Sequence, residues 1–287
     1  MTKKQRQKEL TWRRPKGLKF DITATDRVDD ATWRVLDELC PRRRVLLQYS
    51  TGKDSCAAWY ELQQRGYTVV PVFKEIFPGL SFFDDVIKAH EDFFKTEVHI
   101  VSGRIAMLDK LQQFNSREDL ARFGKQFKDD ILYQCYSKSA LKRYRRLLVD
   151  TLLDEHDCDV SVIGTKASDS LHRRTHFTVD GPYLPSERLF SLVWRLKKSA
   201  PFDTMLAAGM PMPRYYLWLG RSPELALAHE FYMIKQYYPR DYAKLCEWML
   251  NLDSYTLSYE VAGKMKHVLR PMKRIVEAFE AGHPFVG

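Results

Sequence analysis

Short apolar runs alternate with segments of helical periodicity through the first half of the chain. The apolar runs, which are rich in strand-forming residues, predict four strands at residues 45–49, 68–73, 97–101 and 159–163. The periodic segments predict helices at residues 26–40, 55–64, 82–94 and 137–155. Strands that alternate with helices indicate βαβ units. The expected fold is therefore α/β, a Rossmann-like (HUP-type) parallel sheet with helices on both faces.

The pattern changes at two places. Pro71 lies inside the second predicted strand, and because proline cannot donate to a ladder, we expect that strand to be an edge or to be interrupted. Beyond residue 190 the chain becomes helical and aromatic, with several prolines. We therefore expect a basic N-terminal arm at 1–19, an α/β domain at 20–190 and a helical C-terminal region at 191–287.

Length and hydropathy narrow the class of protein. The 287 residues, 45% of them hydrophobic, are enough for one large α/β domain with a helical appendage. No run of 18 or more apolar residues occurs, which excludes a membrane-spanning helix. The basic N-terminus is not followed by an apolar stretch of the kind that a signal peptide needs. These features predict a cytoplasmic protein.

Basic residues are gathered into clusters. The formal net charge is +9. The clusters are at residues 3–19, 42–44, 142–146 and 172–174. Such patches suit a polyanionic partner, a nucleic acid or a nucleotide, whereas the alternative is a solvated surface beside a phosphate site. A partner protein and self-association are left open.

The cysteines are scattered. The five are Cys40, Cys56, Cys135, Cys158 and Cys246. No two form a Cys-x-x-Cys pair, and none has a histidine at zinc-finger spacing. This arrangement predicts free thiols in a reducing compartment, and we expect no iron–sulfur cluster.

A short polar turn, Ser50–Ser55, follows the first predicted strand and precedes a helix. Loop N–H groups and the first turn of the helix converge there, and the helix dipole favours an anion. Gly52 allows close approach of the backbone. The side chains add hydroxyl donors from Ser50, Thr51 and Ser55 and a charge from Lys53. The alternative is an ordinary strand-to-helix turn with a cap.

A second basic segment follows the fourth predicted strand. It begins at Gly164 and carries Lys166, Arg173 and Arg174, which can neutralise phosphate charge. Ligands of parallel sheets bind at the C-terminal ends of the strands, so this segment and the Ser50–Ser55 turn are expected to face one crevice. The alternative is a basic surface loop.

These residues carry a resemblance to a known family. The run Ser50-Thr51-Gly52-Lys53-Asp54-Ser55 resembles the Ser-Gly-Gly-x-Asp-Ser loop of the PP-loop ATP pyrophosphatase superfamily, the adenine nucleotide alpha hydrolase-like proteins. The second segment matches PAPS reductase-like proteins in order, with Gly164, Lys166, Asp169, Ser170 and Arg173. Residues 78–82, 134–138 and 209–222 are similar to the phage and bacterial branch.

The resemblance implies a function. In that family the loop holds the pyrophosphate part of an adenine nucleotide, which here would be ATP, or PAPS or APS, with Mg²⁺. We expect catalytic roles for Lys53 and Asp54. By analogy with other nucleotide sites Asp54 is also expected to be a metal ligand, and the alternative is that it caps the helix. If the nucleotide is ATP, a second substrate is adenylated at the α-phosphate and pyrophosphate leaves. The basic clusters favour nucleic-acid thiolation or a related modification.

The departures from the family leave alternatives open. The C-terminal Glu-Cys-Gly-Leu-His segment of assimilatory PAPS reductases is absent, and Gln134-Cys135 stands where cluster-binding APS reductases have two cysteines. Cys135 is the best candidate for a reactive thiol, because a helix N-terminus with nearby cations lowers the pKa of a thiol, and the alternative is a buried structural cysteine. The alternatives are a divergent sulfonucleotide reductase that uses Cys135, and a nucleotide- or nucleic-acid-binding subunit without chemistry of its own.

Overall fold

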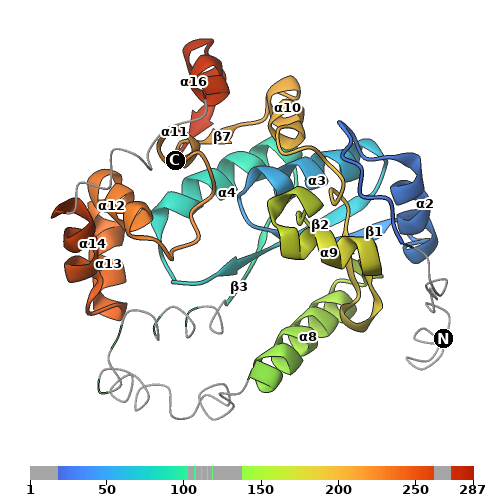
Figure 1. Cartoon of the computed structure of the whole chain (residues 1–287), viewed down its shortest axis with the longest axis horizontal. Helices are drawn as coiled ribbons and strands as arrows, with labels where there is room; N and C mark the ends of the chain where they lie inside the picture. Colours follow the sequence, from blue (N-terminus) through green and yellow to red (C-terminus); the bar gives the residue numbers. More distant parts are fainter. Residues whose placement is uncertain are drawn as a thin grey trace. The chain divides into compact units, whose positions relative to one another are not determined.

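A six-stranded sheet in the order β3-β2-β1-β4-β6-β5 is the framework of the chain (Figure 1). β1 pairs in parallel with β2 and β4, β4 pairs in parallel with β6, and β5 is antiparallel to β6. The strands are β1 (Arg44–Tyr49), β2 (Thr68–Glu75), β3 (His99–Ser102), β4 (Val160–Ile163), β5 (Tyr183–Leu184) and β6 (Leu189–Ser191). The mostly parallel sheet, flanked by helices, confirms the predicted Rossmann-like α/β class.

The computed structural model describes residues 19–102, 107, 111, 115, 118, 138–261 and 273–287. The chain packs into two compact units. The first unit comprises Met1–Phe73, Thr96–His99 and Arg145–Ala208, and the second comprises Lys74–Lys95, Ile100–Tyr144 and Gly209–Gly287. The division at residues 19 and 190 that the sequence suggests stays a prediction, and most of the basic arm lies outside the described residues.

Helices form where the sequence pattern is helical. In the first half they are α2 (Asp30–Leu39), α3 (Lys53–Gln64), α4 (Ser81–Phe94) and α8 (Lys138–Glu155). The later ones are α9 (Leu171–Asp180), α10 (Ala200–Ala207), α11 (Tyr215–Leu219), α12 (Ala228–Tyr237), α13 (Pro239–Trp248), α14 (Leu252–Val261) and α16 (Lys273–Glu280). None of the described helices is long and apolar enough to cross a membrane.

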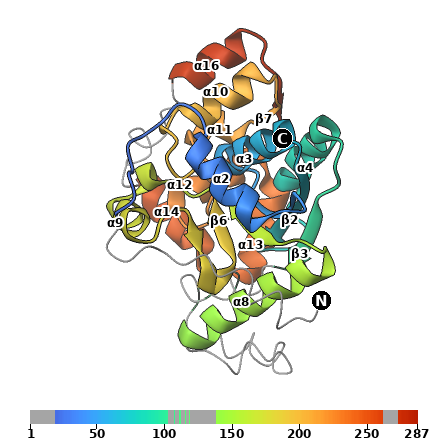
Figure 2. The same cartoon turned by 90° about the vertical axis from the view of Figure 1, so that its right-hand side faces the viewer.

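The core of the first unit is built around β1. Val45, Leu46 and Leu47 are fully buried, or nearly so. α3 presents fully buried small residues, among them Ala57 and Ala58, so the helix can pack close to the sheet. α2 lies beside the end of α3 (Figure 2), where Trp33 stacks on Tyr67 at 6.1 Å between ring centroids.

The prediction that Pro71 marks an edge or an interrupted strand was wrong. β2 runs without a break from Thr68 to Glu75, lies between β3 and β1, and pairs Pro71 with Leu47. A parallel ladder uses alternate residues of a strand for each neighbour, so a missing N–H removes a bond on one side only. Buried apolar neighbours on β2 outweigh that loss.

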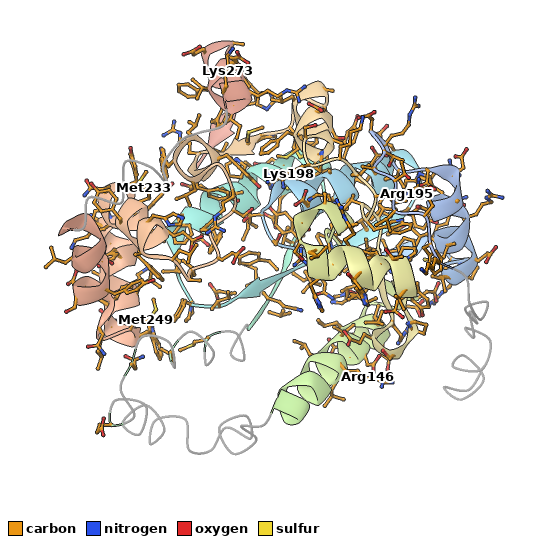
Figure 3. The ribbon with its side chains drawn as sticks, in the orientation of Figure 1. Arg146, Arg195, Lys198, Met233, Met249 and Lys273 are labelled. Carbon is orange, nitrogen blue, oxygen red and sulfur yellow. The ribbon has the colours of Figure 1, made fainter. Side chains whose placement is uncertain are left out.

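The second unit has its own apolar core. Phe231 and Leu245 are buried there beside Met249, which Figure 3 labels. Asp241 of α13 is also buried, and its carboxylate accepts hydrogen bonds from the Ser81 hydroxyl and the Phe82 N–H at 2.9 and 3.0 Å. These groups open α4, whose own N-cap, Leu80, supplies no side-chain acceptor. The α4 N-terminus is therefore capped by a residue far along the chain.

We expect Asp241→Ala to lower the free energy of unfolding by about 1–2 kcal/mol, because the buried N-terminus of α4 loses its acceptor. Chemical denaturation would measure the change. Asp92→Ala is a suitable control, since it removes an exposed carboxylate from α4 itself. Equal denaturation midpoints for the two variants would contradict the capping role.

Candidate functional site

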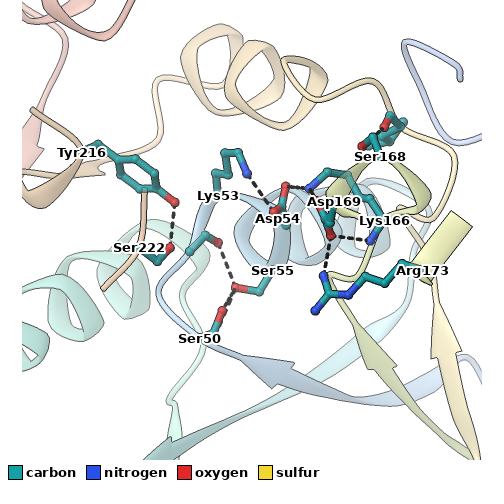
Figure 4. Close-up of polar contacts among 12 residues, drawn as sticks. Ser50, Lys53, Asp54, Ser55, Lys166, Ser168, Asp169, Arg173, Tyr216 and Ser222 are labelled. Carbon is teal, nitrogen blue, oxygen red and sulfur yellow. Dashed lines mark hydrogen bonds and ion pairs between the residues drawn. The ribbon is translucent and has the colours of Figure 1, made fainter. Parts of the chain in front are cut away.

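The turn between β1 and α3 is held in shape by its own hydroxyl groups (Figure 4). The Ser55 Oγ accepts from the Ser50 N–H at 3.2 Å, donates to the Gly52 carbonyl at 2.9 Å and lies 3.1 Å from the Ser50 Oγ. The hydroxyl of Thr51 donates to the Ser50 carbonyl at 2.6 Å. The hydroxyls of Ser55 and Thr51 therefore form hydrogen bonds within the turn, while Ser50 is exposed.

Thr51 has a left-handed backbone conformation, with φ of 56°, and is fully buried. A β-branched residue rarely adopts that conformation, which costs on the order of 1–3 kcal/mol. The resembling family motif has glycine at this position, and that is the only sequence signal for the conformation. The turn thus stores backbone strain where α3 begins.

The two predicted segments meet through a network of charges (Figure 4). The Lys166 ammonium lies 2.5 Å from the Asp54 Oδ1 and 3.2 Å from the Asp169 Oδ1. Lys53 pairs with the Asp54 Oδ2 at 2.8 Å, and Arg173 pairs with the Asp169 Oδ2 at 2.6 Å. The end of β4 and the start of α3 are therefore joined by alternating cations and carboxylates.

Gly164 makes this meeting sterically feasible. A Cβ at this position would lie 2.8 Å from the Asp54 carbonyl carbon and 2.8 Å from the Ser55 nitrogen. Those are backbone atoms in the first turn of α3, which cannot move as a side chain would. The β4 strand can therefore end against the helix only if the residue after it lacks a side chain.

The burial of Lys166 sets the electrostatics of the site. Its side chain is 0% exposed, and an ammonium so buried is tolerable only when it is paired. Burial tends to raise the pKa of Asp169, but Lys166 beside it, with its hydrogen bonds, holds that pKa below its usual value. The three cations and two carboxylates, Lys53, Asp54, Lys166, Asp169 and Arg173, leave one net positive charge.

Lys53 is in a different situation. Burial lowers its pKa, and the nearby Asp54 only partly opposes the effect. The Lys53 ammonium also lies 5.5 Å from the centre of the Phe202 ring on α10. Phe202 was missed by the sequence analysis, because its place beside Lys53 depends on the packing of α10 against α3. The charged form of Lys53 is thus less favourable in the folded chain than in water.

The turn after β4 is fixed by hydrogen bonds within the predicted motif and by neighbours outside it. The Ala167 N–H donates to the Trp194 carbonyl at 2.8 Å, and the Trp194 indole donates to the Thr32 hydroxyl at 2.9 Å. The Lys166 N–H donates to the Asp169 carboxylate at 2.9 Å. Ser170 caps α9, accepting from the Arg173 N–H at 3.1 Å. Ser170 therefore fixes the first turn of α9, from which the Arg173 side chain extends, and the other contacts hold Lys166 in place.

The structure gives no support to the thiol and metal roles that the sequence suggests. Cys135 lies outside the described residues, so its role stays a prediction. Cys56 is fully buried behind the turn, and burial raises the pKa of its thiol. Across the described ranges, no group of three or more His, Cys, Asp or Glu residues could hold a metal ion. Each Asp54 oxygen faces an ammonium, that of Lys53 or that of Lys166. The Asp54 metal role stays a prediction.

The likeness of the chain to known proteins is distant and is found among solved structures. No protein-family model matches the chain, and no curated protein matches it. Among solved structures, the chain is similar to the U34-tRNA thiolase NcsA from Methanococcus maripaludis, described with its [4Fe-4S] cluster. The two are 14% identical with a TM-score of 0.40, over 85% of this chain and 81% of that chain. A likeness this distant carries no argument about activity.

The expectation of no iron–sulfur cluster is corrected by that comparison. The similar solved structure holds a [4Fe-4S] cluster. The expectation rested on the spacing of cysteines along the sequence, whereas the ligands of a cluster are brought together by the fold. Cysteine spacing was therefore not a sufficient reason to exclude a cluster.

We expect Gly164→Ala to lower the free energy of unfolding by about 1–3 kcal/mol, because the new methyl group displaces the first turn of α3. Pyrophosphate binding, measured by calorimetry, should weaken in parallel. Gly209→Ala is the matched control: Gly209 has a positive φ of 64° but open space around it, so it tests backbone strain without a clash. Unchanged pyrophosphate affinity in Gly164→Ala would contradict the close approach.

We expect Lys53→Met to leave the free energy of unfolding unchanged or higher, since the lowered pKa of Lys53 means that its charge costs stability at neutral pH. Pyrophosphate affinity should nevertheless fall about tenfold or more. Lys198→Met removes an exposed lysine of the same unit (Figure 3) and should change neither property. A marked loss of stability in Lys53→Met would show that Lys53 has a structural role.

Proposed function

We propose that the chain binds ATP at the Ser50–Ser55 turn and cleaves it between the α- and β-phosphates. The observation that carries the proposal is the 2.5 Å ion pair between Lys166 and Asp54, which joins the loop motif to the second motif after β4. Both motifs resemble the PP-loop superfamily, and their side chains belong to one network. The proposal extends to an enzyme that adenylates a second substrate; nucleic-acid modification stays a prediction from the basic clusters.

The network is suited to receive an anion. The first turn of α3 directs N–H groups and the positive end of its dipole toward the Ser50–Ser55 turn. An entering phosphate would compete with Asp54 for Lys53. Because Lys166 continues to neutralise Asp54, Lys53 can turn to the phosphate without leaving a carboxylate unpaired. The desolvated ammonium of Lys53 then exchanges the Asp54 carboxylate for a phosphate oxygen.

The reaction that follows is a displacement at phosphorus. A nucleophile of the second substrate forms a bond to the α-phosphorus, and the bond from that phosphorus to the bridging oxygen breaks. The electron pair leaves on pyrophosphate, and AMP stays on the second substrate. Negative charge that develops on the leaving group is stabilised by the N-terminus of α3 and by Lys53.

The described thiols do not favour the reductase alternative. Cys40, Cys56 and Cys158 are buried and Cys246 is partly buried, and burial is the main cause that raises the pKa of each. The pKa of Cys158, for example, rises to about 11. A sulfonucleotide reductase needs a thiolate as its nucleophile, so these residues are poor candidates for that role.

The test combines binding with product analysis. We expect the wild-type chain to bind ATP at least tenfold more tightly than AMP, since AMP lacks the pyrophosphate that the turn would hold. Ser55→Ala, which removes the hydroxyl that shapes the turn, should reduce pyrophosphate release about 100-fold, while circular dichroism stays unchanged. Thr175→Ala, which removes an exposed hydroxyl of α9, is the control.

Calorimetry would measure the affinities, and a coupled pyrophosphate assay would measure release with and without added RNA and DNA. Equal affinities for ATP and AMP would contradict a pyrophosphate-binding turn. Release of inorganic phosphate with ADP would contradict cleavage at the α-phosphate.

A further inference from the structure

Two aromatic rings form a stack at the surface of the second unit. Trp218 of α11 and Tyr237 of α12 lie 3.9 Å apart between ring centroids, and their planes differ by 5°. Tyr237 keeps 52% of its surface exposed. Since Trp218 covers one face of the Tyr237 ring, this exposure leaves the opposite face available to a ligand.

The stack is anchored to the core of its unit. Trp218 also contacts Tyr238 at 5.9 Å between ring centroids, and Tyr238 contacts the buried Phe82 at 5.6 Å. α11 ends immediately after this point at Gly220, whose φ of 66° allows the chain to turn away. The outer ring is therefore held in a fixed orientation, which lowers the entropic cost of stacking a planar ligand on it.

Charged groups of both signs lie near the stack, and two of them are exposed arginines. Arg214 stands four residues before Trp218, so the two lie on the same side of α11. Burial raises the pKa of Tyr238, the carboxylates of Asp85 and Asp241 add to that shift, and Arg214 is close enough to oppose it. Arg240 is exposed two residues after Tyr238. Within the described residues, neither guanidinium has an ion-pair partner, whereas Lys235 nearby pairs with Asp253.

We propose that this surface binds single-stranded nucleic acid, with an unpaired base stacked on the outer face of Tyr237. Arg214 and Arg240 would contact the flanking phosphates. A flat, exposed aromatic face, with exposed guanidinium groups nearby that have no ion-pair partner in the part of the chain that the structure describes, matches the stacking and charge of such a strand. A base in a duplex offers no free face, and the net charge of +9 adds long-range attraction. This surface uses the second unit alone and does not depend on the ATP site.

The test measures binding of labelled 12-nucleotide single strands of DNA and RNA, and of a matched duplex, by fluorescence anisotropy at several salt concentrations. We expect both single strands to bind more tightly than the duplex, and any difference between them reports contacts to the sugar. Tyr237→Leu should weaken single-strand binding about 5- to 100-fold, because one stacked base is lost, while Tyr237→Phe should retain it.

Two further variants separate stacking from charge. Tyr232→Leu removes another tyrosine of α12 and should bind as the wild type does. Arg214→Gln should weaken binding to all single strands alike and lower the slope of log affinity against log salt concentration by about 1. Absence of single-strand binding by the wild-type chain would overturn the proposal. Equal binding by the wild type and Tyr237→Leu would also overturn the proposal, as would preference for the duplex.

Discussion

A fully buried ammonium is the constraint on which the candidate site depends. Lys166 is shielded from water, so it needs carboxylates, and it takes them from two directions: Asp54 on the helix after β1 and Asp169 on its own turn. Exclusion of water strengthens each of these ion pairs, and it makes the loss of either carboxylate strongly destabilising. One side chain thereby ties together two segments that are more than a hundred residues apart in the sequence. The relative position of α3 and β4 follows from it.

That ion pair has a steric counterpart. The charges can meet only because Gly164 lets the end of β4 approach the backbone of α3, and because Trp194 and Thr32 hold the following turn in place. Attraction and close packing select the same geometry, which is typical of sites that must be rigid before a ligand arrives. Lys53 differs from this rigid group. Burial lowers its pKa, so its charged form is unfavourable there, and an incoming anion would stabilise that charge.

The sequence predicted the elements better than it predicted their contacts. Apolar periodicity located β1, β4 and α3 to within two residues, since burial imposes that periodicity directly. Pro71 led to the wrong prediction of an edge or interrupted strand, because the sequence does not show which neighbours a strand has. The site residues could be named from motif order, but not their roles. Nothing local indicates that Lys166 is buried, that the Ser55 hydroxyl faces inward, or that Phe202 lies beside Lys53.

The cap that Asp241 places on α4 also sets an order of events during synthesis. The carboxylate and the Ser81 hydroxyl that it holds are 160 residues apart, so the helix emerges from the ribosome long before its cap. At about 5–20 residues per second the delay is on the order of ten seconds. The first unit ends at Ala208, whereas the second needs segments up to Gly287. The sheet around β1 and β4 can therefore complete its packing before the Asp241 carboxylate is available to cap α4.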